Sequence, residues 1–206
     1  MSNSPLRLKK GMKPFACAKN GRFFHLPSAI LSSPIYPQHA EAFKVAADIV
    51  LDSHQATKRG QHRDTLVFPV LYLYRHCLEL KLKDLVLLGV HTHFFNLTDV
   101  ADALGEHELC PLWTKAKRLI LASYPTDCEA AVAESIINDF HQIDKDGQTL
   151  RYDRKKGTLK LRRYERLPTH VGIADLRTTM DSIFQYLDNC YAGILDCWDA
   201  AEQARR

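Results

Sequence analysis

The chain has 206 residues, of which 46% are hydrophobic and 25% are charged, so it can bury enough apolar surface for one ordinary domain. This composition excludes a wholly disordered chain, and no apolar run reaches the roughly 18 residues that a membrane-spanning helix needs. The N-terminus lacks the pattern of a secretory signal, and the six cysteines form no C-x-x-C pair. We therefore expect a cytoplasmic protein with reduced thiols, no membrane partner, no metal and no other cofactor.

The net charge of +4 hides two basic segments. Residues 1–22 contain six Lys and Arg and no acidic residue, and residues 151–166 contain eight Lys and Arg with only Asp153 and Glu165 as acids. The rest of the chain is therefore net acidic. Two basic surfaces on an acidic body are typical of proteins that meet phosphate-rich partners, and solubilising tails are the alternative interpretation.

The first 123 residues divide into an arm and helices. Early basic residues, a Phe-Phe pair and three prolines predict an extended basic arm over residues 1–37. Apolar residues then recur at steps of three and four, which is the period of an amphipathic helix. This period predicts helices over residues 38–58, 65–90, 98–104 and 108–123.

The second half should contain two more helices and the only strands. The TDCE sequence at 126–129 has the form of a capping box, so a helix should run from there to about Gln142. Alternating apolar and polar residues on both sides of a Lys-Lys-Gly turn predict a basic β-hairpin over about 148–166. A last helix is expected over 174–204. The predicted fold is all-α, with residues 38–206 forming an antiparallel four- to five-helix bundle and one basic hairpin before the last helix.

Polar side chains interrupt the otherwise apolar helix that is expected over residues 65–90. Their spacing of three or four residues places them in one stripe along the helix. Burial of such groups without partners costs several kcal/mol each, so complementary groups should approach from elsewhere in the chain. The stripe consists of Arg75, His76, Glu79 and Lys83.

The partners of this stripe should come from the residues that leave the helix ending near Gln142. Asp144, Arg151 and Tyr152 are the candidates, and we expect Glu79 to pair with Arg151. Two interpretations follow. The network is either a buried ionic latch that fixes the register of the helices, or the lining of a cleft that binds a phosphate or activates a hydroxyl.

The predicted hairpin offers a second surface. Alternation puts its leucines on one face and its basic residues on the other, so one face can pack while the other contacts a phosphate backbone. Tyr152 could add base stacking. An edge strand protected by lysines is the alternative. The candidate nucleic-acid surface consists of Lys155, Lys156, Lys160 and Arg162.

Over residues 66–152 the chain resembles bacterial proteins of the HEPN-like superfamily. The resemblance rests on LYRHCLELKLK at 73–83, GEHEL at 105–109 followed by LW, FHQID at 140–144 and LRY at 150–152. It implies a helical bundle, a homodimer and a role in a toxin–antitoxin or antiphage system, with an antitoxin as a protein partner. Many members are metal-independent endoribonucleases, so RNA is the implied substrate.

His107 lies in the second of these motifs and is counted with the polar cluster. Its alternative role is structural, with the ring packed against the helices and bonded to a backbone carbonyl near a helix start.

Ribonuclease members of the superfamily carry an Arg, four to six further residues and a His near the start of the last helix. Arg163 and His170 match this spacing, although Pro168 interrupts the segment. If the match holds, a neutral His170 takes the proton of a ribose 2′-hydroxyl while Arg163 stabilises charge on the phosphate. Cleavage then leaves a cyclic phosphate end.

The central helix offers an alternative catalytic site. There His76 would be the base, Arg75 or Arg151 would bind the phosphate, and Glu79 would orient the imidazole. The competing hypothesis is a non-catalytic interaction or regulatory module in which the Arg-His-Glu-Lys cluster is purely structural.

Overall fold

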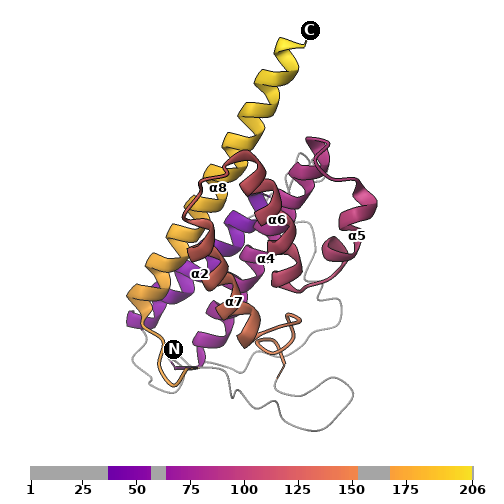
Figure 1. Ribbon diagram of the computed structural model, residues 1–206. Helices are drawn as coiled ribbons and strands as arrows, with labels where there is room; N and C mark the ends of the chain where they lie inside the picture. The colour runs from indigo at the N-terminus through magenta and orange to yellow at the C-terminus, as the bar shows by residue number, and fades with distance from the viewer. Residues whose placement is uncertain (1–36, 57–63, 153–167, 206) are drawn as a thin grey trace, which may run out of the picture. The chain divides into compact units, whose positions relative to one another are not determined.

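Six α-helices make up most of the part of the chain that the computed structural model describes, which is residues 37–56, 64–152 and 168–205. The chain divides after Pro34, and every described residue belongs to the unit Ile35–Arg206. No strand occurs in the described residues, which confirms the all-α class. The helices are α2 (Pro37–Ala56), α4 (Val67–His91), α5 (Leu97–Gly105), α6 (Leu109–Ser123), α7 (Ala130–Ile143) and α8 (Ile173–Ala204) (Figure 1).

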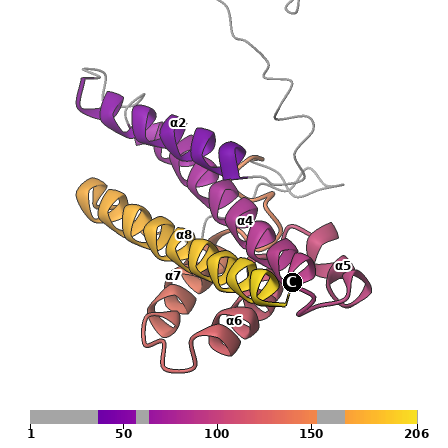
Figure 2. The ribbon, with the colours of Figure 1, turned by 90° about the horizontal axis from the view of Figure 1, so that it is seen from above.

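Helix α4 lies at the centre and packs against α2, α5, α6 and α8 (Figures 1 and 2). Its sequence has no helix breaker between Pro69, which falls in the first turn, and Gly89 near the end. Side chains around most of its circumference are buried, as expected for a helix surrounded by others. The apolar positions that defined it in the sequence are all in the core: Leu71, Leu78, Leu82, Leu85 and Val86.

Helix α8 follows its predicted range closely. Its buried side chains recur at steps of three and four, so one stripe of the helix faces the core and the rest faces solvent. This stripe consists of Met180, Ile183, Phe184, Leu187, Cys190 and Ile194.

A polar clamp holds α2, α4 and α8 together. The Tyr74 hydroxyl of α4 donates a hydrogen bond to Asp48 of α2 at 2.5 Å. Lys44 of α2 pairs with Asp48 at 3.0 Å and with Asp181 of α8 at 2.5 Å. Arg177 of α8 donates to the backbone carbonyl of Asp48. The clamp fixes the first half of α4, which carries the polar stripe.

The predicted capping box does not form. Helix α7 begins at Ala130, and its N-cap Glu129 makes no side-chain capping bond. Asp127 accepts the backbone N–H of Glu129 at 2.8 Å instead, and it also accepts the hydroxyl of Tyr186 at 2.7 Å. A short Asp side chain that bonds the amide two residues ahead favours a turn over a helix start.

The predicted hairpin is only partly covered by the described residues. Residues 149–151, expected in its first strand, form a turn. Lys155, Lys156, Lys160, Arg162 and Arg163 lie outside the described residues, as does the predicted arm up to residue 36. None of the described helices is both long enough and apolar enough to cross a membrane.

Candidate functional site

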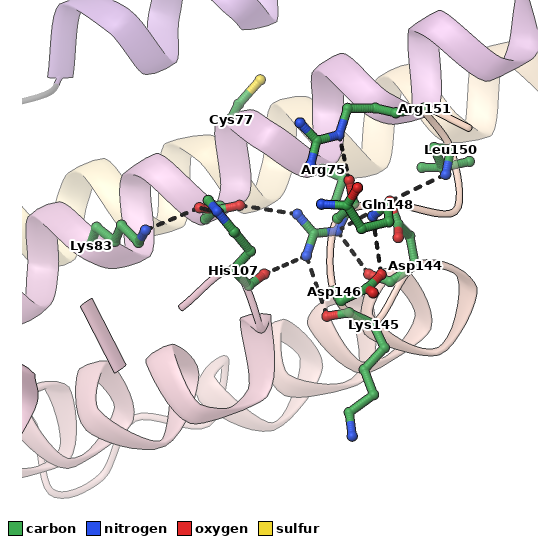
Figure 3. A network of polar contacts seen from close by, with 12 residues as sticks. Arg75, Cys77, Lys83, His107, Asp144, Lys145, Asp146, Gln148, Leu150 and Arg151 are labelled. Atoms are coloured by element: carbon green, nitrogen blue, oxygen red, sulfur yellow. Dashed lines mark hydrogen bonds and ion pairs between the residues drawn. The ribbon is translucent and has the colours of Figure 1, made fainter. Parts of the chain in front are cut away.

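Arg75 is the centre of the polar cluster, and its side chain is only 1% exposed. Its Nε donates to the backbone carbonyl of Asp144 at 2.8 Å, and its Nη1 donates to Glu79 Oε2 at 3.1 Å. Its Nη2 donates to the backbone carbonyl of His107 at 2.5 Å (Figure 3). One guanidinium therefore joins α4 to the segment before α6 and to the end of α7. A third carbonyl, that of Lys145, accepts from Nη2 at 3.5 Å, so the partners are three carbonyls and a carboxylate, which suit the planar array of donors.

The turn after α7 wraps around this guanidinium. Asp144 is fully buried; its Oδ1 accepts the N–H of Thr149 at 2.7 Å, and its Oδ2 lies 3.7 Å from Nε of Arg75. Gly147 has φ +71°, and a Cβ at that position would lie 3.2 Å from Nη1 of Arg75. The side chain of Asp144 thus closes the turn, which explains why residues 149–151 do not begin a strand.

Glu79 is the buried carboxylate of the cluster, with 3% exposure. Its Oε1 lies 3.1 Å from Lys83 Nζ and 2.8 Å from His107 Nδ1, while Oε2 binds Arg75. Burial acts to raise the pKa of this carboxyl, but the His107 hydrogen bond and the cations of Lys83 and Arg75 outweigh burial and hold the pKa below its usual range. Glu79 is therefore ionised.

The predicted pair of Glu79 with Arg151 is wrong. Arg151 donates from Nε to the carbonyl of Gly147 at 2.6 Å, and its guanidinium lies over the rings of Tyr72 and Tyr152. The physical reason is local: Arg75 is one helical turn from Glu79 on the same helix, so it fills the buried space beside the carboxylate.

His76 sits beside the cluster, between two aromatic rings. Its imidazole stacks on Tyr72 with the ring centroids 6.0 Å apart, and Phe43 of α2 packs edge-on at 4.6 Å. Burial lowers the pKa of His76, so the ring is neutral at physiological pH. The alternative site expected Glu79 to orient His76, but the carboxylate contacts the His107 ring instead.

His107 is the member of the cluster that reaches the surface. Its side chain is 55% exposed, while its Nδ1 contacts the buried Glu79. A carboxylate can only accept, so Nδ1 holds the proton and Nε2 of the neutral ring has a lone pair. The structure places His107 in the cluster through a direct bond to Glu79 that was not predicted. The GEHEL motif placed it before a helix, and only the packing of α6 on α4 brings the two side chains together.

The second predicted catalytic pair is separate from this cluster. His170 is exposed, bonds Thr169 Oγ1 at 3.2 Å and lines a pocket of about 510 Å³ with Leu51 and Val67. Arg163 lies outside the described residues. The cluster itself brings together five predicted residues: Arg75, Glu79, Lys83, His107 and Asp144.

Sequence reasoning missed two residues that shape the site. Tyr72 supplies the ring on which both His76 and Arg151 rest, and its position one turn before His76 is the signal that could have found it. Gly147 makes room for Arg75 through its positive φ. No group of three His, Cys, Asp or Glu side chains in the described part of the chain is arranged to hold a metal ion.

Comparison of the chain with known proteins and structures found no match among family models, curated proteins or solved structures. Its function is therefore inferred from the chemistry of the cluster and of the side chains around it.

Proposed function

We propose that this chain is a HEPN-like protein of a defence or toxin-type system that binds RNA along one edge of α4. The observation that carries the proposal is a row of cationic, imidazole and aromatic side chains that borders the sealed network of Arg75, Glu79 and Asp144. We call this row the open edge. It consists of Tyr72, His76, Lys83, His107, Arg151 and Tyr152.

The spacing of the open edge supports contact with a chain of phosphates. His76 and Lys83 are two turns apart on α4, so they lie on the same side of the helix about 10 Å apart. Lys83 and His107 meet on the same oxygen of Glu79. Arg151 has no carboxylate partner among the described residues, and its guanidinium can bind phosphate.

The sequence extends this edge. Arg151 is the first residue of the basic segment 151–166, so the cations of the open edge lead directly into that segment. The proposal includes the basic hairpin, with Lys155, Lys156, Lys160 and Arg162 contacting the RNA backbone. It also includes the antiparallel bundle, a homodimer, an antitoxin as protein partner and a cytoplasmic location.

The proposal extends to metal-independent cleavage by attack of a ribose 2′-hydroxyl. His107 has the most suitable geometry for the base, because Glu79 fixes its Nδ1 and its ring is open to solvent. Arg75 is sealed and bound to carbonyls, so it acts as a positioning residue rather than a phosphate ligand. His76 and the Arg163–His170 pair are the competing bases.

The second candidate function is a non-catalytic interaction or regulatory module. The burial of Arg75, Glu79 and Asp144 favours it, because such a network can serve only to fix the turn after α7 against α4. In that case the open edge binds a protein partner or nothing.

RNA binding is tested by fluorescence anisotropy with a labelled single-stranded RNA at several salt concentrations. We expect Arg151→Glu to weaken binding and to make its salt dependence shallower, because it removes a phosphate contact. Arg205→Glu, which changes an exposed cation at the end of α8, is the matched control and should bind as the wild type does. If the wild type shows no salt-dependent binding to RNA, the proposed function is wrong.

Cleavage is tested on the same RNA in the presence of EDTA. We expect a cyclic phosphate product that is lost in His107→Ala, even at protein concentrations that saturate the RNA with this variant. If cleavage is lost in His170→Ala or in His76→Ala and not in His107→Ala, that residue is the general base. RNA binding without any cleavage would mean that the protein binds RNA but is not a ribonuclease. The absence of both binding and cleavage would favour the interaction module.

A further inference from the structure

Four planar side chains follow one another at the end of the open edge, and we call this group the column: His76, Tyr72, Arg151 and Tyr152. The His76 and Tyr72 rings are nearly parallel, with an interplanar angle of 6° and centroids 6.0 Å apart. The guanidinium carbon of Arg151 lies 5.5 Å from the Tyr72 centroid and 5.6 Å from the Tyr152 centroid. Neighbouring members of the column therefore lie within 6.0 Å of each other in the order His76, Tyr72, Arg151 and Tyr152.

The two ends of the column differ. At the inner end, His76 already has an aromatic neighbour, because the Phe43 ring lies with its centroid 4.6 Å away and its plane at 85° to the imidazole. At the outer end, Tyr152 is 53% exposed and is one of the few large hydrophobic side chains that face solvent in the described residues. The outer end is therefore the end that offers an exposed ring to another planar group.

The sealed network holds this column in place. His76 and Tyr72 are one turn apart on α4, so the helix sets their stacking. Arg151 ends the turn that Asp144 closes around Arg75, and its Nε is bound to the Gly147 carbonyl. The stacking surface is thus organised before any ligand arrives, which reduces the entropy lost on binding.

We propose that the column is a stacking site for one unpaired RNA base, which the outer face of Tyr152 receives while Arg151 binds a neighbouring phosphate. The inference rests on the proposed RNA binding and adds the place at which an unpaired base of that RNA binds. A base within a duplex is already stacked on its neighbours, so it cannot cover Tyr152, whereas the bases of single strands stack readily on aromatic side chains and on Arg.

The experiment compares a single-stranded RNA with the duplex of the same length by fluorescence anisotropy. We expect the single strand to bind at least about 5-fold more tightly, and Tyr152→Ala to remove this preference, because base stacking on an aromatic ring is worth about that factor or more. Tyr152→Phe should keep the preference, since the ring remains. Arg151→Lys should weaken binding to the single strand, because it keeps the charge but removes the planar group.

The matched control is Phe94→Ala, which removes another half-exposed aromatic ring that is not part of the column. It should leave both affinities unchanged. A second readout is a 2-aminopurine placed in the single strand, whose fluorescence should be quenched by the wild type and less by Tyr152→Ala.

The outcomes separate the two proposals. If the wild type binds neither RNA, the proposed function fails and this inference fails with it. If the wild type binds both RNAs equally, or if Tyr152→Ala binds the single strand as tightly as Phe94→Ala does, RNA binding stands and the stacking site is wrong. Thermal unfolding checks that each variant is folded. Because Tyr152 is exposed, Tyr152→Ala and Tyr152→Phe should both fold as the wild type does.

Discussion

Glu79 and His107 form a contact that joins the interior of the protein to its surface. The carboxylate is almost fully buried, whereas the imidazole that it meets at 2.8 Å is more than half exposed. The same carboxylate is neutralised by Arg75 and Lys83, so it is a fixed anion that holds one tautomer of an accessible His. This arrangement lets a structural network position a reactive group.

The network should depend strongly on Arg75. We expect Arg75→Ala to lower the free energy of unfolding by about 3–5 kcal/mol, because it leaves Oε2 of the buried Glu79 and three backbone carbonyls without the donor that Arg75 supplies. Urea unfolding followed by circular dichroism measures this loss. Arg205→Ala, at an exposed site, should change stability by less than about 0.5 kcal/mol. A loss of less than about 1 kcal/mol in Arg75→Ala would mean that the network does not support the fold.

Glu79 should make stability sensitive to acid. Burial alone would raise its pKa, but His107, Lys83 and Arg75 hold the pKa below the usual range in the folded state. The unfolded chain therefore binds the proton first, so the stability that Glu79 contributes is complete near neutral pH and is lost as the pH falls below about 4. Urea unfolding from pH 7 to pH 3 measures the loss.

Glu79→Gln is the comparison for this titration. It should be less stable than the wild type at pH 7, and the difference should shrink toward pH 3. A constant difference between the two proteins over this range would contradict the depressed pKa.

Much of the architecture could be predicted because its signals are local. Apolar periodicity together with capping and helix-breaking residues located six helices within a few residues, and the spacing of Arg75, Glu79 and Lys83 showed that they share one face. Because the buried charges of α4 need partners, the sequence also predicted that a polar group from the residues after α7 would lie beside them. Asp144 does so, with its carboxylate 3.7 Å from Arg75.

The partners within the cluster could not be predicted, because they depend on backbone geometry far from each residue. Arg151 was the expected partner of Glu79, yet the positive φ of Gly147 and the side chain of Asp144 turn the chain so that Arg151 meets Tyr72. The contact of His107 with Glu79 depends on how α6 packs on α4, which no local pattern in the sequence specifies.

His76 should contribute a second dependence on pH. Burial lowers its pKa in the folded state, so the unfolded chain binds a proton more readily and stability falls as the pH drops below about 6.5. His76→Phe keeps an aromatic ring between Phe43 and Tyr72 but does not titrate. We therefore expect a smaller fall in stability between pH 7 and pH 5 than in the wild type.

The control for this measurement is His91→Phe, which changes an exposed His at the end of α4. It should retain the fall seen in the wild type. Burial also lowers the pKa of His141, so part of the fall should remain in His76→Phe and should disappear only when His141→Gln is added. If stability depends on pH in His76→Phe as it does in the wild type, protonation of His76 does not contribute to the fall in stability.

Two glycines provide a matched test of the turn that surrounds Arg75. Gly147→Ala should destabilise the protein by about 1–2 kcal/mol, because alanine is strained at φ +71° and its Cβ would press on Nη1 of Arg75 at 3.2 Å. Gly105→Ala, at the end of α5, meets no atom within 4 Å and should be neutral or slightly stabilising. Because the same turn positions Arg151, Gly147→Ala should also weaken RNA binding while Gly105→Ala should not. Equal stability and equal RNA affinity of the two variants would show that the turn is not held by its contact with Arg75.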